Sequence, residues 1–375
     1  MTNKDITKIY FQGNEIVALY KGDTLIFKKS GVVPPKPTGV YTVRGTLKPD
    51  SRAQNIQLCV NGQREQFDVN NDKTFEYTFV NVPVTNMDYF TLQCKDDLKT
   101  LDLSSLDTSQ VTSMFETFYQ CSNLETIDLT NIDTSKVSDT GRLFSGCSSL
   151  QTIDLSSLDT SKVTSMRNMF SSCRNLKSLD VSKFNTSTVT DMLGMFEGCN
   201  NLTSLDVSNF DTSNVKSMGH MFSSCSNLKS LDVSKFNTSK VTDMSLMFIG
   251  NWNITSLDVS NFDTSNVESM HYMFDYDSKL TDLYMNFDVR LNKNFTDIFV
   301  GCNKLTNVVG KFEGTKYDLD LSSCSLTAQS AMVFINGLAT VTETRTLSLS
   351  ATTYDSLTPE QIAIATSKGW TVTRG

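Results

Sequence analysis

A tandem repeat with a fixed period dominates this sequence between positions 98 and 304. Self-similarity at a fixed period is the signature of a solenoid, because one unit cannot bury its apolar face alone whereas stacked units build a continuous core. The chain is therefore predicted to form a quasi-one-dimensional stack with different segments closing its two ends. The copies begin at Leu98, Leu124, Leu150, Leu176, Leu202, Leu228 and Ile254, and degenerate copies begin at Leu280 and Leu305.

One copy, residues 202–227, predicts the local structure of all of them. Leu202, Leu205 and Val207 follow an L-x-x-L-x-L spacing, in which apolar and polar residues alternate as in a strand with one buried face. The stretch 211–213 reads Asp-Thr-Ser, a turn and helix-cap signal. Apolar residues at steps of three and four then follow over 215–225, typical of a short helix. The predicted fold class is an α/β repeat, a leucine-rich-repeat-like solenoid with a parallel sheet and short helices.

The flanking segments have different patterns and predict small modules. Short alternating stretches separated by Gly, Asn and Asp indicate antiparallel strands before the repeats. After the repeats, Thr358-Pro359-Glu360-Gln361 indicates a helix start with proline at the first position. The predicted organisation is a small β-meander anchor at 1–30, a proline-rich linker at 31–38, a small β-sandwich or N-terminal cap at 39–97, the solenoid at 98–304, and an α/β cap at 305–375.

The cysteines and methionines recur with the repeat and not with any catalytic or metal-binding spacing. Cys121, Cys147, Cys173, Cys199 and Cys225 occupy the same position in successive copies, and the next two equivalent positions hold Asn251 and Asp277. We therefore interpret these cysteines as buried free thiols that pack as small hydrophobic groups. The methionines fill the same core.

The repeats resemble the BspA-like leucine-rich-repeat family of bacterial surface proteins, with its LDVSxFDTSxVxxMxxMFxxC unit. The resemblance covers about residues 98–304. It implies a leucine-rich-repeat-like solenoid and a role in extracellular attachment, and it brings no catalytic residue. Phe184, Phe210 and Phe236 stand where leucine-rich repeats usually have an asparagine ladder.

Charge and composition exclude several classes of function. The formal net charge of -8 arises entirely within 98–279, so nucleic-acid binding is not expected. No stretch is apolar enough to span a membrane, and the segment 1–30 does not have the pattern of a secretory signal. Only two histidines occur, His220 and His271, at different repeat positions. We expect no enzyme activity, no cofactor and no metal centre.

The first candidate binding surface is a column of aspartates, here called the Asp ladder, with flanking hydroxyl residues. Like charges one strand apart repel by roughly 1 kcal/mol in water. Either hydrogen bonds from neighbouring Ser and Thr, with solvent screening, offset this repulsion, or the ladder binds a cation or a polyhydroxylated ligand along the concave face. The ladder comprises Asp102, Asp128, Asp154, Asp180, Asp206, Asp232 and Asp258, with Ser156, Ser182, Ser208, Ser234 and Ser260 beside it.

The second candidate lies where the repeats lose their regularity. Trp252, Tyr272, Tyr276 and Tyr284 occupy positions that are polar in earlier copies. Exposed aromatic side chains favour contacts with sugars or proteins. Repacking of the solenoid toward its terminal cap would produce the same substitutions, because terminal repeats are commonly atypical.

The sequence favours an attachment or structural role. The leading hypothesis is a bacteriophage virion protein of the fibre or decoration type, assembled in the host cytoplasm and held to other virion proteins through its N-terminal segment. The solenoid would then face a host surface protein or glycan, and assembled copies are expected to be multimeric. The alternative is a bacterial cell-surface adhesin, and a third possibility is decoration without any ligand.

Overall fold

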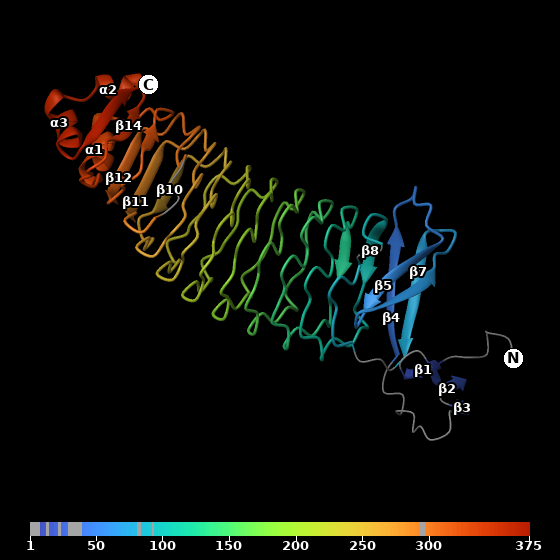
Figure 1. The fold of residues 1–375 in the computed structure, drawn as a ribbon. Helices are drawn as coiled ribbons and strands as arrows, with labels where there is room; N and C mark the ends of the chain where they lie inside the picture. The colour runs from blue at the N-terminus through green and yellow to red at the C-terminus, as the bar shows by residue number, and fades with distance from the viewer. Residues whose placement is uncertain are drawn as a thin grey trace.

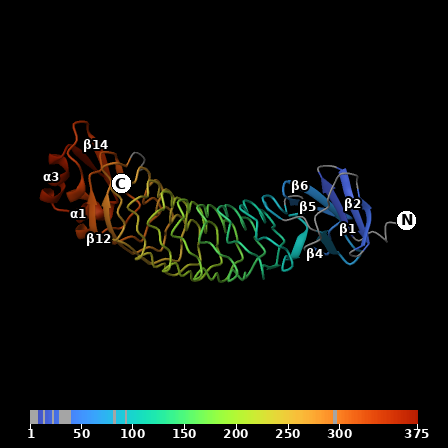
Figure 2. The same ribbon diagram turned by 90° about the horizontal axis from the view of Figure 1, so that it is seen from below.

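The computed structural model describes residues 8–12, 15–21, 24–28, 40–80, 84–91, 94–292 and 297–375. The chain forms a β-solenoid of about 11 turns, here called coils. Figure 1 shows a long rod with strands at the N-terminal end and helices at the C-terminal end, and Figure 2 shows that the rod is bowed. A single hydrophobic core extends from Val43 to Trp370.

Three strands precede the rod. They are β1 (Lys8–Gln12), β2 (Glu15–Lys21) and β3 (Thr24–Lys28). Neighbours pair antiparallel in the order β1-β2-β3, the arrangement of a meander. The predicted linker at 31–38 lies outside the described residues.

The following strands join the solenoid directly. The strands β4 (Val40–Leu47) and β7 (Thr74–Val80) belong to the same sheet as β8 (Leu98–Asp102) and β9 (Thr126–Asp128), in the order β7-β4-β8-β9. Only β5 (Asn55–Val60) and β6 (Gln63–Asp68) form a separate hairpin. Residues 40–80 thus extend the first sheet of the solenoid, in the place where the sequence predicted a small β-sandwich or N-terminal cap.

The predicted helix of each repeat is a run of tight turns instead. In one coil the backbone N–H groups of Met218, His220, Phe222 and Ser224 donate to carbonyl groups of the next coil, at 2.7–3.0 Å. The intervening N–H groups of Met221, Ser223 and Cys225 donate to carbonyl groups three positions earlier, at 3.0–3.4 Å. The prediction of short helices in the repeats was therefore wrong, because the next coil supplies the hydrogen-bond partners that a helix would find within its own turn.

Two positions in each run of turns have a left-handed backbone. His220 has φ of 57° and Ser224 has φ of 56°, and the same two positions hold Gly194 and Gly198 one coil earlier. A left-handed residue every few positions is incompatible with an α-helix, and glycine adopts this conformation at the lowest cost. The glycines inside the predicted helical stretches were the available sequence signal for turns.

The opposite side of the coils is paired as strands only near the ends of the rod. Beyond β9, the next strands are β10 (Ser256–Val259), β11 (Asp282–Asp288) and β12 (Asn307–Glu313), which pair parallel and in register. The described coils between β9 and β10 contain no strand, so the predicted parallel sheet is present only near the ends of the rod. Isolated parallel bridges connect these coils, running from Ser113 through Asp139 and onward to Ser269.

The core consists of columns with the repeat period, as predicted. The phenylalanine rings from Phe118 to Phe299 stack with centroids 5.3–6.0 Å apart and planes within 16° of parallel. Cys121, Cys147, Cys173, Cys199 and Cys225 are fully buried, and all nine cysteines of the chain are free thiols. The interpretation of the repeat cysteines as core residues is confirmed.

The C-terminal cap, which contains the helices of the described residues, covers the end of the core. It contains β13 (Leu319–Leu321), α1 (Ala328–Gly337), β14 (Arg345–Leu349), α2 (Ala351–Asp355), α3 (Pro359–Ser367) and β15 (Trp370–Arg374). Phe334 of α1 packs edge-on against Phe299, the last ring of the stack, at 5.6 Å. The predicted capping signal at Thr358 is present as a complete capping box with Gln361.

Candidate functional site

The Asp ladder lies in one column, as its period predicts. At the N-terminal end, Asp102 of β8 pairs in register with Asp128 of β9. At the C-terminal end, Asp258 of β10 pairs with Tyr284 of β11, so the column changes from acidic to aromatic there. Asp102 is half-buried and the other six carboxylates of the ladder are exposed.

Each ladder carboxylate is held by the residue two positions ahead. The Oδ1 atom accepts a hydrogen bond from the backbone N–H of that Ser or Thr at 2.8–2.9 Å in all seven coils. This is an Asx turn, in which an aspartate side chain takes the place of a backbone acceptor. The serines named with the ladder, Ser156, Ser182, Ser208, Ser234 and Ser260, are the donors in their coils.

These hydrogen bonds favour the ionised form. For Asp102, Asp154, Asp180 and Asp206, hydrogen bonds from the serine side chain and then from its backbone lower the pKa. For Asp232 the backbone bond is the larger cause of the lowered pKa. Neighbouring carboxylates act in the opposite direction, as Asp232 and Asp180 do on Asp206, but the local hydrogen bonds prevail.

A second acidic column avoids like-charge contact. In the bridge column, Ser113, Asp139, Ser165, Asp191, Ser217, Asp243 and Ser269 alternate, so two carboxylates are always separated by a serine. Neighbouring coils are joined by backbone hydrogen bonds on this side, for example from Met218 to Asp243 at 3.0 Å. The Asp ladder lacks this alternation, and it lies on the side where most coils are not paired as strands. Most consecutive carboxylates of the Asp ladder therefore lie in coils that are not paired as strands, and the pair Asp102 and Asp128 on β8 and β9 is the exception at the N-terminal end.

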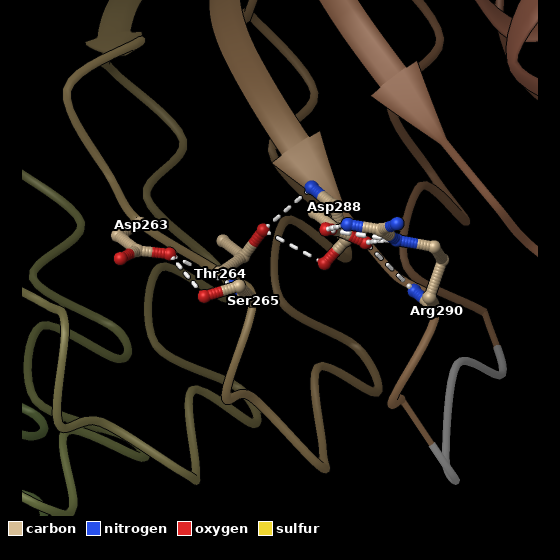
Figure 3. Close-up of polar contacts among 5 residues, drawn as sticks. All are labelled: Asp263, Thr264, Ser265, Asp288 and Arg290. Carbon is tan, nitrogen blue, oxygen red and sulfur yellow. Dashed lines mark hydrogen bonds and ion pairs between the residues drawn. The ribbon is translucent and has the colours of Figure 1, made fainter.

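A ladder of buried threonine hydroxyls joins the coils beside the second Asx turn of each repeat. Figure 3 shows one rung, in which Thr264 Oγ1 donates to the carbonyl of Asp288 at 3.0 Å and accepts from the Asp288 N–H at 2.8 Å. Ser265 N–H donates to Asp263 Oδ1 at 3.0 Å, and Arg290 pairs with the Asp288 carboxylate. Each hydroxyl thus satisfies backbone groups of the next coil. A threonine hydroxyl donates to a carbonyl group of the next coil in the same way at Thr108, Thr134, Thr160, Thr186, Thr212 and Thr238.

Sequence reasoning assigned these threonines to a helix cap and so missed their role. The available signal was a threonine at the same position in seven consecutive copies. A helix cap tolerates Ser, Asn or Asp equally well, so an invariant Thr at a capping position within this chain indicates a different constraint. The threonines are 1–4% exposed, which makes them part of the core and not of a ligand-binding face.

A large groove lies where the N-terminal sheet meets the Asp ladder. It has a volume of about 1060 Å³ and is lined by residues of β4, β7, β8 and β9 and of the two segments 129–133 and 154–157. The pairing of these strands places Arg44 between Glu76 and Asp102, and Asp102 beside Asp128. A second row in the same sheet consists of threonines, Thr74, Thr46, Thr100 and Thr126.

The groove is strongly acidic. Its lining contains the carboxylates Glu76, Asp102, Asp128, Asp133 and Asp154 and the single cation Arg44. Arg44 Nε donates to Glu76 Oε2 at 2.9 Å, and the charge of Arg44 also lowers the pKa of Asp102 after the hydrogen bonds of Ser104. Within the described chain Asp128 and Asp154 form no ion pair. The described residues include no group of three side chains that could hold a metal ion.

The structure divides the predicted aromatic patch between two sides of the coil. Trp252 and Tyr276 are the most exposed members, at 56% and 60%. Tyr276 lies on the turn side, at a left-handed position with φ of 59°, and Tyr272 occupies the preceding left-handed position. Tyr284 lies in the column of the Asp ladder, in register with Asp258 and Val309. The four residues therefore do not form one surface.

A buried polar pair interrupts the cysteine column next to these aromatics. The Asn251 N–H donates to Asp277 Oδ1 at 2.7 Å, and the two residues are at most 2% exposed. Burial raises the pKa of Asp277 well above its ordinary value. The Oδ1 atom of Asn251 has no hydrogen-bond partner. Sequence analysis noted both substitutions, but their energetic cost becomes visible only when the coils are stacked.

Among the described residues, no helix has the length and apolar character needed to cross a bilayer. A search of curated proteins returns no match to this chain. A search of solved structures also returns none.

One family model matches the chain three times in overlapping segments, at residues 64–178, 144–253 and 221–328. Together the three matches run from β6 to the first residue of α1, well over half of the chain. The tandem matches agree with the coils that the structure shows. The chain belongs to the repeat family described as "Mycoplasma protein of unknown function, DUF285".

Proposed function

We propose that this chain is a non-catalytic attachment protein whose solenoid presents a binding surface along a long rod. The observation that carries the proposal is the continuous core, which runs from Val43 in the N-terminal sheet to Trp370 in the cap. Extended solenoids of this kind offer long binding surfaces whose length is set by the number of repeats. The resemblance of the repeats to BspA-like leucine-rich-repeat proteins of bacterial surfaces supports the same role.

We place the protein in a bacteriophage virion, as a fibre or decoration protein that contacts other virion proteins through its N-terminal strands. The free thiols support assembly in a reducing cytoplasm. An unfolded chain with nine cysteines would be prone to disulfide formation in an oxidising compartment before its coils could form. Once folded, the thiols are protected, because burial raises the pKa of Cys173 and Cys225 to about 12. A bacterial cell-surface adhesin is the alternative.

The attachment role is tested with the purified full-length chain, labelled with a fluorophore and incubated with bacterial cells. Saturable binding that is lost after protease treatment or glycan oxidation of the cells is the expected result, and the sensitive treatment identifies the receptor class. Binding to no cell type would contradict attachment and favour decoration alone. Peptide mass spectrometry of purified virions and of washed bacterial surface fractions then separates the phage location from the bacterial one.

A further inference from the structure

We propose that the groove over β7, β4, β8 and β9 binds an extended basic peptide segment of a partner protein, through the carboxylates of Asp102, Asp128 and Asp154. The inference rests on the proposed function as a binding protein and specifies the ligand. In this groove the Asp ladder borders a hollow of about 1060 Å³.

The size of the groove favours a polymer segment over a small molecule. Small-molecule sites typically measure about 300–1,000 Å³ and enclose most of their ligand. This groove reaches the top of that range and remains open, because its lining extends over four neighbouring strands and two further segments of the solenoid. An extended peptide lying across the strands would contact the groove over its full width.

The negative charge of the groove favours a ligand with positively charged side chains. Arg44 is already paired with Glu76 and adjacent to Asp102, whereas Asp128 and Asp154 have no cationic partner in the described chain. In Asp128 and Asp154, one carboxylate oxygen accepts the backbone N–H of Thr130 or Ser156. Both carboxylates are exposed to solvent, so a lysine or arginine side chain of a ligand gains a charge-assisted hydrogen bond with them.

The row of threonines offers hydrogen-bond donors and acceptors for a peptide backbone. Thr74, Thr46, Thr100 and Thr126 lie beside the acidic row on the same four strands. The hydroxyls of Thr46 and Thr100 are 2.8 Å apart and hydrogen-bonded to each other. Hydroxyl groups both donate and accept, so this row matches the alternating N–H and C=O groups of an extended chain.

The spacing of the carboxylates fits basic side chains at alternate residues. Carboxylates on neighbouring strands repeat at about 4.8 Å, while alternate side chains of an extended peptide repeat at about 6.6–6.8 Å. Lysine and arginine have flexible stems that accommodate this difference. A sugar ligand is less favoured, because the aromatic ring in the lining, Phe75, is only 2% exposed and cannot stack on it.

The test uses the full-length chain and a matched pair of double variants from the same ladder. Asp128→Asn with Asp154→Asn removes two charges inside the groove, and Asp206→Asn with Asp232→Asn removes two charges outside it. Both variants should fold, because the chain itself uses asparagine in the second Asx turn of two coils. Ser187 N–H donates to Asn185 Oδ1 and Ser239 N–H donates to Asn237 Oδ1, each at 3.1 Å.

Binding is measured by fluorescence anisotropy with a short labelled peptide of alternating Lys and Thr, and with Glu-Thr and Ser-Thr peptides of equal length. We expect the Lys-Thr peptide alone to bind, more weakly at high salt. The groove variant should lose about tenfold or more in affinity, equivalent to about 1.4 kcal/mol, and the control variant less than about twofold. Equal losses in both variants would assign the binding to the rod's overall charge and overturn the proposal.

Absence of Lys-Thr binding, or equal binding of the Ser-Thr peptide, would also overturn the proposed ligand class. Competition by an uncharged oligosaccharide such as maltoheptaose would reassign the groove to glycans. Cell attachment is measured on the same protein samples. Cell attachment without peptide binding would contradict only the ligand class, whereas peptide binding without any cell attachment would contradict the attachment role.

Discussion

The cysteine column differs between the first coils and the coils near the cap, although the backbone is the same. In the regular coils, the thiol of Cys199 donates to the Phe170 carbonyl at 3.2 Å and leaves no strong hydrogen-bonding group unpaired. At the equivalent position one coil after Cys225, Asn251 donates to the carbonyls of Phe222 and Phe248 but has an unpaired oxygen. One coil further, Asp277 buries a carboxyl group with no cation beside it in the described chain.

The comparison shows how a solenoid accommodates irregular residues. A thiol makes one weak hydrogen bond and behaves as a small apolar group, so it can be repeated at no cost. An amide or a carboxyl group at the same position must be fully hydrogen-bonded or it destabilises the fold. Because each coil contacts only its neighbours, the cost of the two polar residues stays local. The coils around residues 251–277 are therefore expected to be the least stable part of the regular stack.

The largest effect is expected when a carboxyl group is introduced into the cysteine column of a regular coil. Cys199→Asp buries a carboxyl group in the thiol column and should lower the free energy of unfolding by about 3–5 kcal/mol at pH 7. Chemical denaturation and amide hydrogen exchange of the flanking coils would measure it. Cys199→Asn is the matched neutral control and should cost less. Equal effects of the two substitutions would show that charge is not what distinguishes Asp277.

The reverse substitution should stabilise the irregular coils. Asp277→Asn keeps an acceptor for the Asn251 N–H and removes a buried charge, so it should raise stability at pH 7 by about 1–3 kcal/mol. The pKa of Asp277 is raised in the folded state, so the folded chain binds more protons than the unfolded chain. The wild type should accordingly lose stability, relative to the variant, as the pH rises from about 4 toward the folded-state pKa.

Asp275 adds a smaller dependence of the same sign, because burial raises its pKa to about 6. The ladder aspartates act in the opposite direction. The lowered pKa values of Asp154 and Asp180 mean that their contribution is present at neutral pH and lost as the pH falls through the folded-state pKa. Thermal denaturation of the wild type and of the Asp277→Asn variant between pH 4 and pH 8 separates the contribution of Asp277 from that of the ladder aspartates. Parallel stability curves would contradict a buried ionising carboxyl group.

A smaller gain is expected from restoring the column at its first interruption. Asn251→Cys removes the unpaired buried oxygen and should stabilise the chain by about 1 kcal/mol. It also removes two donated hydrogen bonds, to Phe222 and Phe248, which limits the gain. Hydrogen exchange in the coil that contains residue 251 measures the change. A loss of stability would mean that the two donated bonds outweigh the unpaired oxygen.

The smallest effect concerns a position of the regular coils that alternates between lysine and asparagine, at Lys183, Asn209, Lys235 and Asn261. The Asn209 side chain donates to the carbonyls of Val181 and Phe184 in the preceding coil, each at 3.1 Å, whereas the next coil has Lys235 at that position. Asn209→Ala should cost about 1 kcal/mol and Lys235→Ala less than about 0.5 kcal/mol, measured by denaturant midpoints. Equal costs would show that the hydrogen bonds of the Asn209 side chain do not stabilise the stack.

Sequence reasoning succeeded where the decisive contacts repeat at fixed spacing or are local. The period alone predicted that Phe222, Met221 and Cys225 would be buried, because only stacking can cover the apolar face of each unit. Local capping chemistry predicted the start of α3 at Thr358. The Asp ladder was predicted as a column for the same reason.

The remaining features depend on partners in the next coil or further away along the chain. Apolar residues at steps of three and four are compatible with either a helix or a run of tight turns. The chain forms turns because carbonyl groups of the next coil accept hydrogen bonds from the N–H groups of residues such as His220.

The acidic groove exists because β4 pairs with β8, a contact between segments far apart in the chain, which places Arg44 beside Asp102. The period, the core columns and the start of the last helix could be predicted from the sequence, because they follow from local pattern and repetition. The backbone between the columns and the groove at the N-terminal end could not, because both depend on hydrogen bonds between segments that are distant in the chain.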